Sequence, residues 1–432
     1  MSTETHQPAP ESAEQGDQAA AAAAAAAAPE VLANSFGEYA RIQGRRIRSG
    51  ESGALPVTIG LIAIVIYFQS RNSLFLSAGN LVNLLVQGTP FIILGMAEVF
   101  VLLLGEIDLA AGYTGGVCAV ITAWTVFSVP WWLAILLGLA TGAFLGLFFG
   151  TLITRLRIPS FVVTLAGLLG LQGVMIVLVA RSGHGPGGSI PISNSIIDDL
   201  TTGNLSVTAG WIVMVVIVAV AGLALILSDR QRRAAGLDTP PASVTALKIA
   251  VMAVAGVVVV LIGNTNRGVL VPLRGVPWVV VIVLGVLVIW SALLGRTRFG
   301  RYIYAIGGNA EAARRAGVNL ILIRTLAFVL TGLTAGIAGI IEASRLGSIS
   351  TDLDGGQLVL FAVAAAVIGG THLFGGHGKM IHALLGGLVV AAIYNGLGLL
   401  GMSAAATYIV TALVLLAAVT VDALSRRGAA AT

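Results

Sequence analysis

Twelve apolar runs, separated by short breaks rich in glycine, proline or charge, constrain this chain more than any other feature. An apolar helix needs about 20 residues to cross roughly 30 Å of hydrocarbon. Only helices and closed barrels satisfy their backbone groups there. The pattern therefore predicts an all-α fold, a polytopic transmembrane bundle of about 10–12 spans. The runs lie near 55–69, 81–104, 109–128, 131–153, 160–180, 210–228, 246–263, 277–295, 323–343, 357–374, 381–400 and 404–423.

Composition supports a membrane protein. Mean hydropathy is +0.97 and only 10% of residues are charged, whereas soluble domains carry about 25%. The single cysteine, Cys118, lies within an apolar run, which leaves no disulfide framework and no cysteine metal site. Connections between the runs are short. The longest on the outer side, 181–209, is expected to form a partly ordered lid or docking surface.

The chain divides into three parts. Residues 1–50 hold an Ala-rich tail, expected to be disordered, and a basic segment that precedes the first span. Residues 51–425 are the predicted transmembrane domain, which includes the loop 296–322. Residues 426–432 form a short tail. Without a sizeable soluble domain, any nucleotide-driven step needs a site on another chain.

Basic residues predict the orientation. If the N-terminus is cytoplasmic, nineteen of the 24 Lys and Arg residues fall on the cytoplasmic side. This bias places both termini in the cytoplasm of a multi-pass plasma-membrane protein. It also accounts for the net charge of +5 without a nucleic-acid partner. The five on the outer side are Arg71, Arg181, Arg267, Arg274 and Arg345.

A polar stretch, "YAIGGNAEAARRAG" at 304–317, interrupts this apolar chain within the predicted cytoplasmic loop. Asn309 can cap the following amides, Glu311 sits in the first turn, and basic residues sit in the last. Gly317 suits the end of a helix. The pattern predicts a short helix over 310–316, too short to be stable alone. It is either held by packing against the membrane domain or a partner, or it is an ordinary loop with a helical turn.

The surrounding sequence resembles a known family. "TRFGRYIYAIGGNAEAARRAGV" at 297–318 is similar to the coupling-loop signature of ABC-type sugar import permeases of the ribose and xylose group. In that family the loop docks into the ATPase subunit. We expect the helix here to meet that partner and to hold nothing else in place. The resemblance implies that the docking residues are Gly308, Asn309, Glu311, Ala312, Ala313, Arg314, Arg315 and Gly317.

Further segments resemble the same family in the same order. Examples are "GEIDLAAGYTGG" at 105–116, "IPSFVVTLAG" at 158–167 and "AVAAAVIGGTHLFGGHG" at 362–378. The extra apolar pair around "SDRQRRAAG" is typical of the xylose-type branch. One departure is that Val359 and Phe361 stand where the ribose-type pattern has acids.

The resemblance implies a function. The chain would be the permease subunit of an ATP-driven importer for a monosaccharide, xylose or a related pentose or hexose. It would not be an enzyme and would hold no cofactor, because ATP and Mg would sit on the separate ATPase subunit. The implied partners are that ATPase, an extracytoplasmic sugar-binding protein, a second permease copy in a homodimer, the sugar and the lipid bilayer.

Three carboxylates lie in or beside the spans, where charge is costly and usually faces an interior cavity. Glu98 and Glu106 are eight residues apart and are expected to share a helix face. Asp108 opens the next run, where capping is favoured over a cavity role. Polar residues within apolar runs are the other candidates for a translocation cavity, each with a helix–helix hydrogen bond as the alternative. The full candidate set is Gln87, Glu98, Glu106, Asp108, Thr164, Gln172 and Asn395.

Other chemistry is disfavoured. His372, His377 and His382 lack a nearby carboxylate or cysteine, so loop and interface roles are favoured over a metal site. No catalytic site is predicted. Two other functions remain as alternatives. A stand-alone secondary transporter or facilitator would show similar halves and paired ionisable residues, and a membrane-embedded enzyme would need clustered histidines or carboxylates at one depth.

Overall fold

The computed structural model describes residues 55–413, except 184–187, 237–238, 240 and 269–270, together with 416 and 420. The predicted tails 1–50 and 426–432 lie outside the described residues. The elements are α3 (Leu55–Arg71), α4 (Ala78–Leu102), α5 (Ala111–Thr125), α6 (Trp131–Leu156), α7 (Ser160–Arg181), β1 (Ser189–Pro191), α8 (Ser195–Thr202), α9 (Val207–Ala234), α10 (Ala242–Asn264), α11 (Trp278–Arg296), α12 (Arg298–Gly308), α13 (Ala310–Arg315), α14 (Leu320–Leu346), β2 (Ser348–Ser350), α15 (Gly355–Ile368) and α16 (Met380–Leu399).

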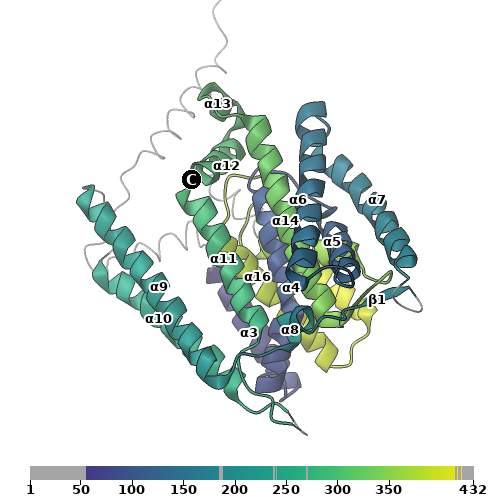
Figure 1. Cartoon of the computed structure of the whole chain (residues 1–432). Coiled ribbons are helices and arrows are strands. Elements are labelled where there is room, and N and C mark those ends of the chain that lie inside the picture. Colours follow the sequence, from purple (N-terminus) through teal and green to yellow (C-terminus); the bar gives the residue numbers. More distant parts are fainter. Residues whose placement is uncertain are drawn as a thin grey trace, which may run out of the picture.

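The prediction of a polytopic helical bundle is confirmed (Figure 1). Eight of the described helices are long and apolar enough to span a membrane. Shorter apolar helices cover the first and tenth predicted runs, and a helix over Ala404–Leu413 covers the described part of the last. The run at 109–128 corresponds to the 15-residue α5. Each run therefore contains a helix, since apolar length and glycine or proline breaks fix where helices can form.

Helices α4 and α14 form the centre of the bundle. In the most apolar 18-residue stretch of α4, 83% of the residues are buried. Helix α14 packs on α4, α5 and α6. Glycines make the close approach between α14 and α6 possible. A Cβ added at Gly332 would overlap the carbonyl oxygen of Gly142, and one at Gly146 would overlap that of Phe328. Lipid provides no hydrophobic drive between helices, so close packing of this kind holds them together.

The hairpin of α9 and α10 lies at the edge of the bundle (Figure 1). In the most apolar 18-residue stretch of each of these helices, only 11% of the residues are buried. Contact with the bundle is concentrated at the end formed by the start of α9 and the end of α10, in a cluster of Leu205, Val260 and Val276. These two helices are the extra apolar pair seen in the sequence.

The connection 181–209 packs on the end of α14, as far as it is described. Strand β1 pairs antiparallel with β2, with Ile190 opposite Ile349 and both buried. From α8, the Thr201 hydroxyl lies 2.7 Å from the Ser344 hydroxyl. The expected partly ordered lid is thus a packed cap in its described part, lying opposite α13 in the molecule (Figure 1).

Candidate functional site

Helices α12 and α13 form a hook at one end of the molecule (Figure 1). The side chain of Asn309 accepts a hydrogen bond of 2.9 Å from the amide of Ala312, which caps α13. At the other end the amide of Val318 donates to the carbonyl of Ala313, while Gly317 adopts φ 83°. This is the glycine-terminated helix end that the sequence predicts. The predicted helix over 310–316 is confirmed to within one residue.

The charges of α13 pair with each other. The Glu311 carboxylate accepts from Arg314 at 2.8 Å and from Arg315 at 3.1 Å. These hydrogen bonds lower the pKa of Glu311. All three side chains are at least half exposed, so the pairs add little to stability. They present one carboxylate and two guanidinium groups, net positive, on an exposed surface.

One small residue of α13 faces inward. Ala313 is 5% exposed and belongs to the main apolar cluster of the bundle, whereas Ala312 is exposed. The expectation that this helix holds nothing else in place is therefore wrong for Ala313. A six-residue helix cannot persist alone, and this buried alanine is how the membrane domain holds it.

The hook rests on two other loops through backbone contacts. Gly307 lies so close to the end of α4 that an added Cβ would overlap the carbonyl oxygen of Leu103. The amide of Gly376, from the connection between α15 and α16, donates to the same carbonyl at 2.9 Å. The hydroxyl of Tyr304 on α12 donates to the carbonyl of Gly378 at 2.7 Å. We call this set of backbone contacts the seat of the hook. It was not predicted from the sequence, although the glycines of "IGGTHLFGGHG" could have indicated a close backbone approach there.

The three histidines belong to the same region. The rings of His372 and His377 stack 4.8 Å apart, and His382 is buried in the first turn of α16. Among the described residues, no group of three histidine, cysteine or acidic side chains is placed to hold a metal ion.

The acidic residues gather next to this seat, although not as the sequence suggested. Helix α4 ends at Leu102, so Glu106 lies in the following connection and does not share a helix face with Glu98. That expectation is wrong because the chain turns at Gly105, which has φ 73°. Instead, Glu106 pairs with Arg324 of α14 at 3.3 Å.

Asp108 plays the capping role that was favoured. Its carboxylate accepts 3.0 Å from the amide of Ala110 at the start of α5, and its own amide lies 3.5 Å from a carboxylate oxygen of Glu98. Burial raises the pKa of Asp108 to about 7, although hydrogen bonds from the amides of Ala110 and Ala111 oppose this. Burial also raises the pKa of Glu106, and Arg324 opposes that shift.

Thr164 joins this cluster from α7, with its hydroxyl 3.3 Å from the carbonyl of Ile107. Glu98 is fully buried, and one of its carboxylate oxygens has no hydrogen-bond partner. Gln172, further along α7, is half-buried and lines neither of the two pockets described below. The candidates on α7 are therefore not brought together with Gln87 and Asn395.

Gln87 and Asn395 do meet, in a polar pocket near the start of α4 and the end of α16. The side-chain amide of Asn395 donates to Gln87 at 3.3 Å, and that of Asn80 donates to Asn395 at 2.8 Å. The pocket has a volume of about 390 Å³, within the range of small-molecule sites. Its lining contains no charged residue. Sequence reasoning did not single out six further polar members, which are Asn80, Asn83, Gln357, Tyr394, Thr407 and Tyr408.

The pocket and the hook lie at opposite ends of α4. The pocket includes Asn80, Asn83 and Gln87 from its first turns, and the seat of α12 involves Leu103 just beyond its last turn. Glu98 lies between them on the same helix. A single helix, with Pro90 within it, therefore runs from an uncharged polar pocket at one end to the seat of an exposed charged helix at the other.

Comparison with known proteins gives consistent results. Residues 80–419 match the family described as "Branched-chain amino acid transport system / permease component". The xylose transport system permease protein XylH of Escherichia coli K12 is 34% identical over 378 residues, which cover 85% of this chain and 91% of that protein. XylH of Haemophilus influenzae is 33% identical over 86% of this chain and 97% of its own length.

A ribose permease is also similar. The ribose import permease protein RbsC of Escherichia coli K12 is 30% identical over 368 residues, which cover 84% of this chain and 92% of that protein. No solved structure matches the chain.

Proposed function

Since the chain belongs to the family of transport-system permease components, we propose that it is the permease subunit of an ATP-driven importer for a monosaccharide. Xylose or a related pentose is the favoured sugar, because the xylose permeases are more similar than the ribose permease and because the α9–α10 hairpin supplies the extra apolar pair.

The observation that carries this proposal is the exposed helix α13. It has strong capping at both ends, a buried alanine that anchors it and a charged face that contacts nothing else among the described residues. A helix of six residues is not needed to join α12 to α14. An exposed, rigidly held helix fits a docking element for the separate ATPase subunit.

The polar pocket favours a sugar over an amino acid. A free amino acid carries a carboxylate and an ammonium group, and burying either without a charged partner is costly. Five side-chain amides and the hydroxyls of Tyr394, Thr407 and Tyr408 line the pocket, with no charged residue. Amides and hydroxyls both donate and accept, which matches the hydroxyl groups of a neutral sugar.

The pocket and α13 suggest how the importer works. ATP and Mg would bind to the ATPase, and this chain would supply no cofactor. Movement of α13 would pass through the backbone seat at Gly307 and Leu103 to α4, and so to the pocket. Such coupling shifts an equilibrium between two access states only as far as the partners bind those states differently.

The remaining partners and the orientation belong to the same proposal. An extracytoplasmic sugar-binding protein would deliver the sugar to the pocket end, and two permease copies would form the membrane unit. With the α13 end in the cytoplasm, Arg157, Arg232 and Arg296 at the ends of α6, α9 and α11 fall on the inner side. That orientation would follow the positive-inside rule, and both termini would then be cytoplasmic.

The deciding experiment combines this chain with the ATPase and sugar-binding protein proposed as its partners. In proteoliposomes, we expect xylose uptake only when all three proteins and ATP are present. Glu311→Lys should abolish co-purification with the ATPase and uptake, because it reverses a charge at the docked face. Arg232→Glu, a charge reversal on the exposed α9 at the same end of the molecule, is the matched control. Uptake by the chain alone would instead support the alternative of a secondary transporter or facilitator.

A further inference from the structure

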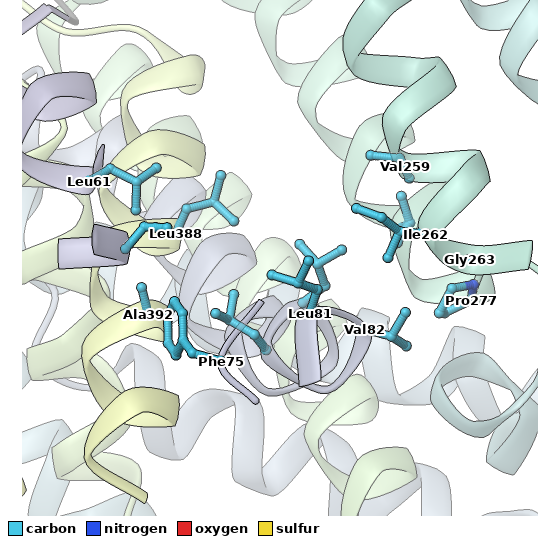
Figure 2. A pocket seen from close by; sticks show the side chains of 14 residues that line it. Leu61, Phe75, Leu81, Val82, Val259, Ile262, Gly263, Pro277, Leu388 and Ala392 are labelled. Atoms are coloured by element: carbon cyan, nitrogen blue, oxygen red, sulfur yellow. The ribbon is translucent and has the colours of Figure 1, made fainter. Parts of the chain in front are cut away.

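An apolar crevice separates the start of α4 from the hairpin of α9 and α10. Figure 2 shows Val259 and Ile262 of α10 on one side, Leu61 of α3 and Leu388 of α16 on the other, and Leu81 of α4 between them. The cavity is about 190 Å³ in volume, and every lining residue is apolar. All of these residues except Phe75 and Pro277 belong to apolar helices, so the crevice opens at the depth of the membrane.

The lining indicates what kind of group can fill the crevice. A cavity of about 190 Å³ with a wholly apolar lining fits part of a single acyl chain, which needs no hydrogen-bond partner. A second copy of the chain is the alternative occupant that the test below distinguishes. An empty groove of this kind would leave its lining without contact atoms on one side, which favours occupancy.

Three arginines lie in or next to the elements that line the crevice, and one of them contacts it directly. The guanidinium of Arg267 donates to the carbonyl oxygen of Gly263, which lines the crevice, and to that of Gly275 at 3.1 Å. Arg274 lies in the same connection between α10 and α11, and Arg71 ends α3. Within the described part of the chain, no ion pair joins these arginines to a carboxylate.

The segments that line the crevice also lack acidic residues, although Asp198 and Asp199 of α8 lie close in sequence to Asn204, whose side chain accepts from Arg267 at 2.9 Å. The segments 55–97, 242–310 and 379–413 contain no Asp or Glu. An apolar slot at membrane depth with arginines beside it is the chemistry that recognises an anionic phospholipid. Because acyl chains gain no hydrophobic energy over the surrounding bilayer, the headgroup must supply the preference.

We propose that this crevice is a binding site for one anionic phospholipid, with an acyl chain between α4 and α10 and the headgroup at Arg267 and Arg274. The lipid would fill the space beside the hairpin, which touches the bundle mainly through the cluster of Leu205, Val260 and Val276. This site lies apart from the polar pocket and does not depend on which solute is transported.

The test is native mass spectrometry of the full chain in mild detergent, titrated with phosphatidylglycerol and separately with phosphatidylcholine. We expect one phosphatidylglycerol per chain, bound at least fivefold more tightly than phosphatidylcholine. Val259→Trp fills the crevice and should weaken phosphatidylglycerol binding at least fivefold. Val258→Trp is the matched control, because Val258 is 47% exposed on the same helix and does not line the crevice, and its binding should stay within twofold.

Two further variants test the headgroup. The Arg274 side chain is exposed, so Arg274→Gln should leave the fold intact and reduce the preference for phosphatidylglycerol over phosphatidylcholine. Arg267→Gln should do the same, while Arg267→Lys retains the charge and the preference. The Arg274 variant keeps the test valid if loss of the Arg267 hydrogen bonds prevents folding.

Several results would overturn the proposal. One is wild-type phosphatidylglycerol binding by Val259→Trp. Equal binding of the two lipids by the wild-type chain is another. If Val259→Trp dissociates a dimer while lipid binding is unchanged, the crevice is an interface between copies. A cross-link from position 259 into residues 1–54 would show that the chain's own N-terminal segment occupies it.

Discussion

The backbone amide of Asp108 lies 3.5 Å from a carboxylate oxygen of Glu98, and the two side chains are 1% and 0% exposed. Burial disfavours the ionised form of the Asp108 carboxyl group and so raises its pKa. Glu106, in the same connection, pairs with Arg324 of α14. Among the described residues, no ion pair joins Asp108 to a cation.

The first prediction concerns pH. The folded-state pKa of Asp108 is about 7, and its ordinary value is 3.8. Between these values the folded chain binds more protons than the unfolded chain, so stability falls as pH rises from about 4 to about 7. Asp108→Asn stays neutral and keeps the oxygen that accepts from Ala110. Between pH 4 and pH 7, the unfolding temperature of this variant in detergent should change by a few degrees less than that of the wild type. Parallel curves for variant and wild type would contradict the assignment.

The second prediction concerns the seat of the hook. Gly307→Ala places a methyl group against the Leu103 carbonyl and the Gly376 amide, so the backbone contact must open. Overpacking of this kind costs about 1–3 kcal/mol. Gly295→Ala, near the end of α11, is the control, because nothing lies within 4 Å of its added Cβ. We expect a lower unfolding temperature and weaker coupling of ATP hydrolysis to uptake for Gly307→Ala alone. If both alanine variants retain full coupling, α12 does not transmit movement through this contact.

The third prediction separates the two faces of α13. Ala313→Trp should destabilise the folded protein by at least about 1–3 kcal/mol, because Ala313 is packed against the bundle. Ala312→Trp should fold normally, because Ala312 is exposed, and should fail to co-purify with the ATPase. Size-exclusion profiles and a pull-down of both variants give the two readouts. Normal ATPase binding by folded Ala312→Trp would remove this face from the proposed interface.

The fourth prediction concerns the polar pocket. Tyr408→Phe removes only the hydroxyl, which lies 3.4 Å from the side-chain oxygen of Gln357. If this group bonds the sugar, its loss should raise the KM for uptake roughly 2–13-fold, equivalent to about 0.5–1.5 kcal/mol. Tyr67→Phe, on the exposed surface of α3, should leave the KM unchanged. An unchanged KM for Tyr408→Phe would place the sugar path elsewhere.

The sequence by itself determined where the helices lie, including the short helix after Asn309. Apolar runs, glycine breaks and capping residues act over a few neighbouring positions, and each of the twelve runs and the helix after Asn309 could be located from them. The family was also visible in the sequence, because its motifs are contiguous. The sequence did not show that Ala313 is buried while Ala312 is exposed, because both are alanines and only packing distinguishes them.

Only the tertiary structure decided which polar residues act together. Gln87 and Asn395 meet although 308 positions separate them, and Asn80 joins them. Glu106 separates from Glu98 because α4 ends at Leu102 and then turns. Contacts between distant segments depend on how whole helices pack, and the sequence pattern records only whether each residue prefers lipid, protein or water.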